Sequence, residues 1–192
     1  MRKLPEELEN PIDNLIYNIV EKVAPFFYRF KFTPNMITTL GNICTLFFIK
    51  FIFDYQFKLA AFFFGLSYFF DCLDGYFARK YNMVTCIGDY YDHLSDTLKT
   101  LVLFYALYII NKKLLYKIIP LIVILFILVC IHMANQEVFY DKPESSKSLQ
   151  MLNIFSFSNQ ETVVKHLKYS RYFGCGTLTL LLTCVIFFYK KQ

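Results

Sequence analysis

The residues best suited to chemistry in this chain are four aspartates that lie within apolar, helix-forming segments. Asp71 and Asp74 are three residues apart, and Asp92 and Asp96 are four residues apart. These spacings place each pair on one face of its helix. If the two helices pack antiparallel, the four carboxylates meet at one depth.

Four carboxylates inside a membrane need counter-charges, because an unpaired charge there costs several kcal/mol. Arg79 and Lys99 can offset two of them, and the economical counter-ion for the group is a divalent metal. Oxygen ligands select Mg²⁺, Mn²⁺ or Ca²⁺. Enzymes that catalyse displacement at phosphorus commonly bind two metal ions about 4 Å apart. The carboxylates alone would also suit a membrane protein that binds and passes divalent cations.

The composition is that of a small integral membrane protein. Of 192 residues, 56% are hydrophobic and 18% charged, and the mean hydropathy is +0.40. Soluble domains carry about a quarter charged residues, so a soluble globular enzyme, a disordered chain and a collagen-like fibre are excluded. The net charge of +5 does not indicate nucleic-acid binding. Its basic residues flank apolar runs in small groups, as membrane anchors do, without a nucleic-acid-binding module.

The apolar runs predict an all-α, polytopic transmembrane bundle of five to six spans, since a span needs roughly 20 apolar residues. Five are credible: Met36–Phe53, Lys58–Arg79, Cys86–Ile110, Ile118–Ala134 and Tyr172–Tyr189. A sixth, short or re-entrant segment could lie within residues 137–170.

An amphipathic helix is predicted over residues 11–24, with Asn10 as its N-cap and Pro11 at its first position. Its apolar face is Ile12, Leu15, Ile16, Ile19, Val20 and Val23, and its polar face includes Asp13. Such a helix can lie in the membrane interface or pack on partner helices, and we expect the interface.

Two regions follow from this organisation. Residues 1–35 form a cytoplasmic N-terminus with the surface helix, and residues 36–192 form the transmembrane catalytic domain, with its motif at 71–96. Twelve Lys and Arg residues fall on the side of the N-terminus against seven on the other, which favours N-inside. Five spans then place the C-terminus outside and the aspartates at the cytoplasmic face.

The pattern D-x-x-D-G-x-x-A-R-x8-G-x3-D-x3-D resembles the signature of the CDP-alcohol phosphotransferase (phosphatidyltransferase) family. All eight of its defining residues are present: Asp71, Asp74, Gly75, Ala78, Arg79, Gly88, Asp92 and Asp96. The entry into the first span through Pro34-Asn35, after a surface helix, is also similar to the family's arrangement.

The resemblance implies a transferase of phospholipid biosynthesis. An alcohol attacks the β-phosphorus of a CDP-linked donor, and CMP leaves. Two divalent ions, Mg²⁺ or Mn²⁺, would be bound by Asp71, Asp74, Asp92 and Asp96, with Asp96 also the general base. The donor side would be formed by Gly75, Ala78, Arg79, Thr85 and Gly88. Membrane lipids are expected partners, and a homodimer is an open expectation.

The motif leaves the substrates undecided. Leu73 to Tyr76 and Ala78 to Lys80 look like the branches that join CDP-diacylglycerol to a small alcohol, which we favour. Asp92-His93 looks more like enzymes that join CDP-choline or CDP-ethanolamine to diacylglycerol. His93 is expected to be a hydrogen-bonding neighbour of the aspartates rather than a metal ligand. Lys99 is expected to offset carboxylate charge.

Overall fold

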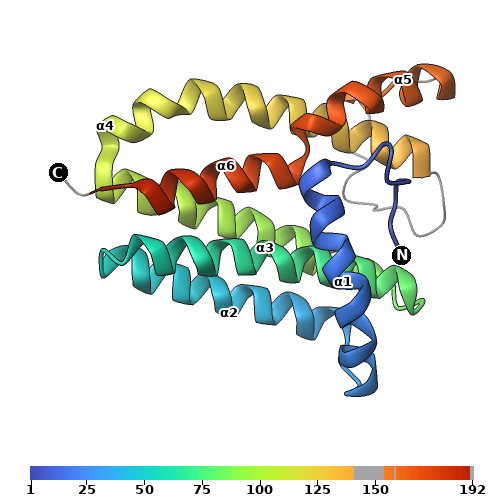
Figure 1. The fold of residues 1–192 in the computed structure, drawn as a ribbon, viewed down its shortest axis with the longest axis horizontal. Helices are drawn as coiled ribbons and strands as arrows, with labels where there is room; N and C mark the ends of the chain where they lie inside the picture. Colours follow the sequence, from blue (N-terminus) through green and yellow to red (C-terminus); the bar gives the residue numbers. More distant parts are fainter. Residues whose placement is uncertain (141–153, 158, 191–192) are drawn as a thin grey trace.

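The computed structural model is a helical bundle (Figure 1). It describes residues 1–140, 154–157 and 159–190, which contain no strand, so the predicted all-α class is confirmed. The possible sixth segment within residues 137–170 falls partly on 141–153 and 158, outside the described residues. The helices are α1 (Pro11–Arg29), α2 (Pro34–Phe53), α3 (Phe57–Lys80), α4 (Cys86–Tyr140), α5 (Gln160–Ser170) and α6 (Cys175–Phe188), with the 3-10 turn η2 (Arg171–Phe173).

Three helical stretches among the described residues are long and apolar enough to cross a membrane: α2, α4 and Gln160–Phe188, which joins α5 to α6. The fourth long helix, α3, has 24 residues but carries Lys58, Asp71 and Asp74 along its length. The aspartates that give the chain its chemistry therefore also make this helix less apolar than its neighbours.

α4 has 55 residues, which at about 1.5 Å each would greatly exceed the thickness of a bilayer. It bends back on itself at Asn111, whose φ of −157° and ψ of 85° are not helical. The two arms run antiparallel (Figure 1). They match the third and fourth predicted spans, but the predicted loop of residues 111–117 is reduced to one residue. Asn111 accepts a hydrogen bond from the Leu114 N–H at 2.9 Å and so caps the second arm.

The motif end of the bundle is the end at which α3 stops and α4 begins. α1 lies across the helices there, and α6 finishes at the opposite end (Figure 1). α1 starts as predicted, because the Asn10 side chain accepts from the Ile12 N–H at 2.9 Å. It continues beyond residue 24 because Phe27 packs against Phe32 and Phe70, and Tyr28 stacks on Tyr81.

α1 buries only part of the apolar face that the sequence pattern predicts, with Ile16 and Val23 packed against the same cluster as Val20. Val20 and Ala24 are fully buried, whereas Leu15 and Ile19 are exposed. Asp13, expected on the polar face, is buried and accepts a hydrogen bond from the Tyr68 hydroxyl at 2.7 Å. An exposed apolar pair beside a buried inner face suits a helix lying between the bundle and a lipid surface.

Glu9 is a second buried carboxyl in this region. It is 3% exposed, its Oε1 accepts from the Asn10 N–H at 3.0 Å, and its Oε2 has no hydrogen-bond partner. Burial, with repulsion from Asp13, raises the pKa of Glu9 to about 7, although its backbone hydrogen bond, Arg79 and Arg2 oppose the shift. Burial likewise raises the pKa of Asp13 to about 6.

Glu9→Gln is expected to flatten the dependence of folding stability on pH. A carboxyl whose pKa rises from 4.5 to about 7 on folding contributes stability at low pH that is lost as pH rises through about 7. The difference corresponds to about 3 kcal/mol. Thermal unfolding of the detergent-solubilised chain between pH 4.5 and 8 measures it, with exposed Glu7→Gln as the matched control. A wild-type melting temperature that does not fall over this interval contradicts the prediction.

Two apolar clusters enclose a polar layer. One cluster, near the motif end, contains Val20, Ile37, Leu73 and Phe77. The other contains Phe48, Ile52, Ala60, Ala61, Leu103 and Ala106. On α2 and α3, the polar residues Thr38, Asn42, Thr45, Ser67 and Asp71 lie between members of the two clusters, and Asp74 lies next to Leu73 of the first cluster. The fold thus places these side chains within the bundle, at one level.

Candidate functional site

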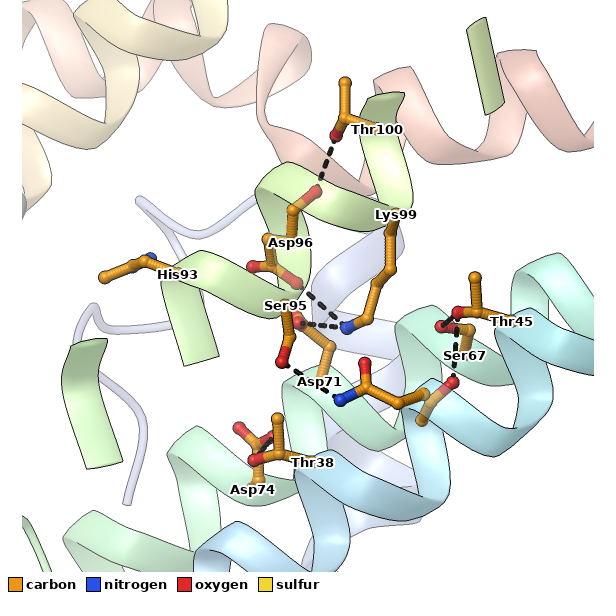
Figure 2. A network of polar contacts seen from close by, with 12 residues as sticks. Thr38, Thr45, Ser67, Asp71, Asp74, His93, Ser95, Asp96, Lys99 and Thr100 are labelled. Carbon is orange, nitrogen blue, oxygen red and sulfur yellow. Dashed lines mark hydrogen bonds and ion pairs between the residues drawn. The ribbon is translucent and has the colours of Figure 1, made fainter. Parts of the chain in front are cut away.

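The aspartates of α3 form one side of the site (Figure 2). Asp74 is 3% exposed, and its Oδ2 accepts a hydrogen bond from the Thr38 hydroxyl of α2 at 2.6 Å. Asp71, one helical turn earlier, has its Oδ1 3.3 Å from the ammonium of Lys99 on α4. Each α3 carboxylate is therefore held by a partner from another helix, as antiparallel packing around this layer predicts.

The aspartates of α4 form the other side. Asp92, His93 and Asp96 each offer a possible ligand atom, and these atoms lie within 4.8 Å of one another. The Nε2 of His93 also lies 3.5 Å from Asp89 Oδ1. The Lys99 ammonium contacts both Asp71 of α3 and Asp96 of α4, so the two pairs of carboxylates face each other across the helices. The expected meeting of all four is confirmed.

Lys99 bridges the two sides. Its Nζ lies 2.9 Å from Asp96 Oδ1 and 3.3 Å from Asp71 Oδ1 (Figure 2). The expectation that Lys99 offsets carboxylate charge is confirmed by these two ion pairs. The Lys99 side chain is 13% exposed and that of Asp71 is 22% exposed, so this pair is more shielded from water than a surface salt bridge, whereas the Asp96 side chain is 40% exposed.

The residues around the carboxylates fit a hard divalent cation. Asp92 Oδ1 is buried without a hydrogen-bond partner, which is costly for a carboxylate unless a cation satisfies it. The available donor atoms are mainly carboxylate oxygens, with one imidazole close by. Such a set favours Mg²⁺ or Mn²⁺ over the softer metals that thiolates select.

A polar stripe on α2, which the sequence reasoning missed, lies against this layer. Asn42 donates to Ser95 Oγ at 3.0 Å and to the Tyr91 hydroxyl at 3.2 Å, while Thr45 and Ser67 share a hydrogen bond of 3.0 Å. On α2, Thr38, Asn42 and Thr45 recur at spacings of four and three among mostly apolar residues. Such spacings place residues on one face of a helix. This periodicity was the signal in the sequence from which the polar stripe could have been predicted.

Arg79 and Gly75 lie at the end of α3. The Arg79 Nε donates to the Met1 carbonyl at 2.8 Å. A Cβ on Gly75 would lie 3.2 Å from Arg79 Nη1, so the absence of a side chain leaves the guanidinium space against the helix. Ala78 accepts a backbone hydrogen bond from Met83 at 2.8 Å, which closes the turn after α3. The guanidinium therefore lies at the motif end, next to the N-terminal segment.

Thr85 and Gly88 form the beginning of α4. The Thr85 hydroxyl accepts from the Gly88 N–H at 3.0 Å, the arrangement of a helix N-cap. A Cβ on Gly88 would lie 3.0 Å from that hydroxyl and 3.1 Å from Asn35 Oδ1. Gly88 thus permits the start of α4 to approach the start of α2. The donor contacts expected of Thr85 and Gly88 stay predictions.

Thr38→Val is expected to weaken divalent-metal binding by roughly tenfold to a hundredfold, the usual effect of removing a hydrogen bond that orients a ligand. Valine has nearly the same shape but leaves Asp74 Oδ2 without its 2.6 Å donor. Titration of the purified protein with Mn²⁺ measures the change. Thr183→Val, at a hydroxyl bonded to its own helix, is the control. Equal Mn²⁺ affinity in both variants would show that Thr38 does not orient a ligand.

Comparison with known proteins extends the likeness beyond the motif. A family model described as CDP-alcohol phosphatidyltransferase matches residues 31–189. No curated protein and no solved structure gave a match. The matched region begins before α2 and ends just after α6, so it includes the whole polar layer.

Proposed function

The chain belongs to the CDP-alcohol phosphatidyltransferase family, and from this we propose that it transfers a phosphatidyl group from CDP-diacylglycerol to a small alcohol. The alcohol oxygen forms a bond to the β-phosphorus of the donor. The bond from that phosphorus to the CMP oxygen breaks, and CMP leaves with the electron pair. The product is a phosphodiester lipid, which places the reaction in phospholipid biosynthesis.

The observation that carries this proposal is the meeting of four motif carboxylates from two helices, beside a motif arginine. Asp71 and Asp96 lie within reach of one ammonium, and Asp92 and Asp96 lie within 4.8 Å of each other. Phosphoryl transfer depends mostly on positioning and charge neutralisation. Carboxylates that can bind divalent ions, together with a guanidinium, supply both.

The protein's own residues have separable roles in this reaction. Asp96 accepts the proton of the attacking alcohol, because its exposed fraction is the largest of the ion-paired carboxylates in the layer, at 40% for the side chain. Arg79 binds phosphate oxygens of the donor in a forked geometry. Gly75, Ala78, Thr85 and Gly88 form the backbone frame on which the cytidine diphosphate portion rests.

Asp71, Asp74, Asp92 and Asp96 would hold two Mg²⁺ or Mn²⁺ ions. When bound, such ions neutralise the diphosphate and stabilise charge on the leaving group. Thr38 keeps Asp74 oriented for this task through its 2.6 Å hydrogen bond.

The runner-up substrates are CDP-choline or CDP-ethanolamine with diacylglycerol as the acceptor. The adjacent Asp92 and His93 favour this branch, because this pair looks more like the corresponding residues of enzymes that use CDP-choline or CDP-ethanolamine. In both branches the same bond to phosphorus forms and CMP leaves. The two differ in whether the lipid belongs to the donor or to the acceptor.

We further propose that the motif end faces the cytoplasm, where CDP-linked donors are available. The excess of Lys and Arg on the N-terminal side supports this orientation. Residues 1–35 then lie at the cytoplasmic surface, and residues 36–192 form the membrane-embedded transferase.

The test is release of CMP by the purified full chain in mixed micelles containing Mg²⁺ or Mn²⁺. CDP-diacylglycerol, CDP-choline and CDP-ethanolamine are compared, each with a panel of acceptors. We expect release from CDP-diacylglycerol only, dependent on an alcohol and abolished by EDTA. Release from an amino-alcohol donor instead selects the runner-up. A chain that binds metal normally but releases no CMP from any donor supports a divalent-cation-handling protein and contradicts the transferase.

A further inference from the structure

Lys99 is an unusual residue in this chain. The other nineteen Lys and Arg residues lie at or beyond the ends of the predicted spans, whereas Lys99 lies well inside one. A cation at such a depth is expensive unless it is paired. Its ammonium is paired twice, with Asp96 Oδ1 at 2.9 Å and Asp71 Oδ1 at 3.3 Å.

The surroundings of Lys99 keep its ammonium in the carboxylate layer. The two ion pairs come from different helices, α3 and α4, so the ammonium lies between the two halves of the motif (Figure 2). On the side of α2, a Cβ added to Gly41 would lie 3.8 Å from Lys99 Nζ, so the backbone of that helix comes close. With 13% of its side chain exposed, Lys99 is not a surface lysine resting by chance on a carboxylate.

The charges suggest what such a lysine does. Four motif carboxylates against Lys99 and Arg79 leave two uncompensated negative charges, which one divalent ion balances. The neighbouring Asp89, which lies 3.5 Å from His93 Nε2, is not one of the four motif carboxylates. A second divalent ion bound to Asp71 and Asp96 would have to share their oxygens with the ammonium and would be repelled by it. The donor's diphosphate brings about two further negative charges, which a second divalent ion balances.

We propose that Lys99 keeps a metal ion from the Asp71–Asp96 side of the site, so that the chain alone binds one divalent ion and binds a second only together with the cytidine diphosphate portion of the donor. This inference rests on the proposed function, because it assigns two metals to the working site. Lys99 is accordingly a positioning residue: it acts on Asp71 and Asp96 and sets the order in which the cations and the donor bind. In this arrangement both divalent ions are bound only when the donor is also bound.

The experiment measures Mn²⁺ stoichiometry on the purified full chain, by equilibrium titration and by electron paramagnetic resonance, with and without CDP. We expect one Mn²⁺ per chain without nucleotide and two with CDP, the second accompanied by a spin-coupled signal. ADP, which binds Mn²⁺ in solution equally through its diphosphate, is the nucleotide control and should not add the second ion to the protein.

Variants separate the charge of Lys99 from its size. Lys99→Met is expected to bind two Mn²⁺ ions without nucleotide, and Lys99→Arg, which keeps the charge, to bind one. Lys80→Met is the matched control, since Lys80 packs against Tyr76 and Tyr81 outside the carboxylate layer, and it should bind one ion. Should Lys99→Met not fold, Lys99→Gln takes its place in the same titration.

Two results overturn the inference while leaving the transferase intact: two Mn²⁺ ions on the wild-type chain without nucleotide, or one ion on both uncharged Lys99 variants. Failure of the proposed function gives a different result. In that case CDP changes neither the stoichiometry nor the spectrum of any variant, and the inference fails with it.

Discussion

Asp96→Asn is expected to lower the rate of CMP release by about a thousandfold, with the protein still folded and still in the membrane fraction. The substitution removes a proton acceptor, which typically contributes 10² to 10⁴ in rate, and weakens a metal ligand at the same time. Asparagine keeps the shape of the side chain and can still meet Lys99, which lies 2.9 Å from the present carboxylate. The measurement is CMP release at saturating donor and Mg²⁺, followed over several hours to quantify the residual rate.

The control for this substitution is Asp54→Asn, which makes the same chemical change at the exposed end of α2, far along the helix from the motif. It should release CMP at the wild-type rate. If Asp96→Asn keeps more than about a tenth of the activity, Asp96 is not the proton acceptor.

Arg79→Lys is expected to lower kcat/KM for the CDP-linked donor by about a hundredfold. Lysine keeps the positive charge but replaces the planar fork with a single ammonium, and hydrogen bonds to charged groups contribute about 1.5–3 kcal/mol. Because the guanidinium is proposed to bind the donor, most of the change should appear in KM for the donor rather than for the alcohol. The Arg79 Nε presently donates to the Met1 carbonyl at 2.8 Å, so the N-terminal segment lies where this contact can be exchanged for a phosphate.

Lys80→Arg is the matched control for Arg79→Lys, because it makes the opposite exchange between lysine and arginine at the next position. Lys80 lies over the rings of Tyr76 and Tyr81, where either cation can pack. We expect its kcat/KM to remain near that of the wild type. An equal loss in both variants would show that the end of α3 needs only a cation at either position, which contradicts a specific role for Arg79.

Much of this architecture could be predicted from the sequence because its strongest signals are periodic. Apolar runs of span length locate α2, α3, the first arm of α4 and α6 within about three residues, whereas the second arm of α4 extends about six residues beyond both ends of the predicted Ile118–Ala134. The spacing of Asp71, Asp74, Asp92 and Asp96 predicts their meeting, which depends only on helical geometry and antiparallel packing. Asn10 caps α1 as expected, since its side chain satisfies otherwise unpaired N–H groups of the first turn.

The features that could not be predicted depend on tertiary contacts. The polar residues Lys112, Lys113 and Lys117 indicate a loop, but Asn111 caps a new helical arm and leaves those lysines within it. Asp13 is polar by type and yet buried, because Tyr68 on α3 supplies a hydrogen bond.

The contacts of the polar stripe of α2 could not be predicted, because its threonines can also form hydrogen bonds within their own helix. A threonine in an apolar helix can satisfy its hydroxyl on its own backbone, as Thr45 does with the Gly41 carbonyl at 3.1 Å. Nothing in the spacing of Thr38 reveals that it also donates to Asp74 across the helix interface.

The roles of the motif residues in catalysis and the division of the chain at residue 35 stay predictions.

The tight reversal at Asn111 has a consequence for how the protein enters a membrane. The first arm of α4 carries Asp92, Asp96 and Lys99, charged residues that oppose insertion of a helix into a bilayer. The most apolar stretch of α4 is more apolar than that of either other candidate span, and residues 118–134 in the second arm are largely Ile, Leu and Val. With a single residue between them, the arms are suited to enter the bilayer as one hairpin, in which the apolar arm offsets the unfavourable transfer of its charged neighbour.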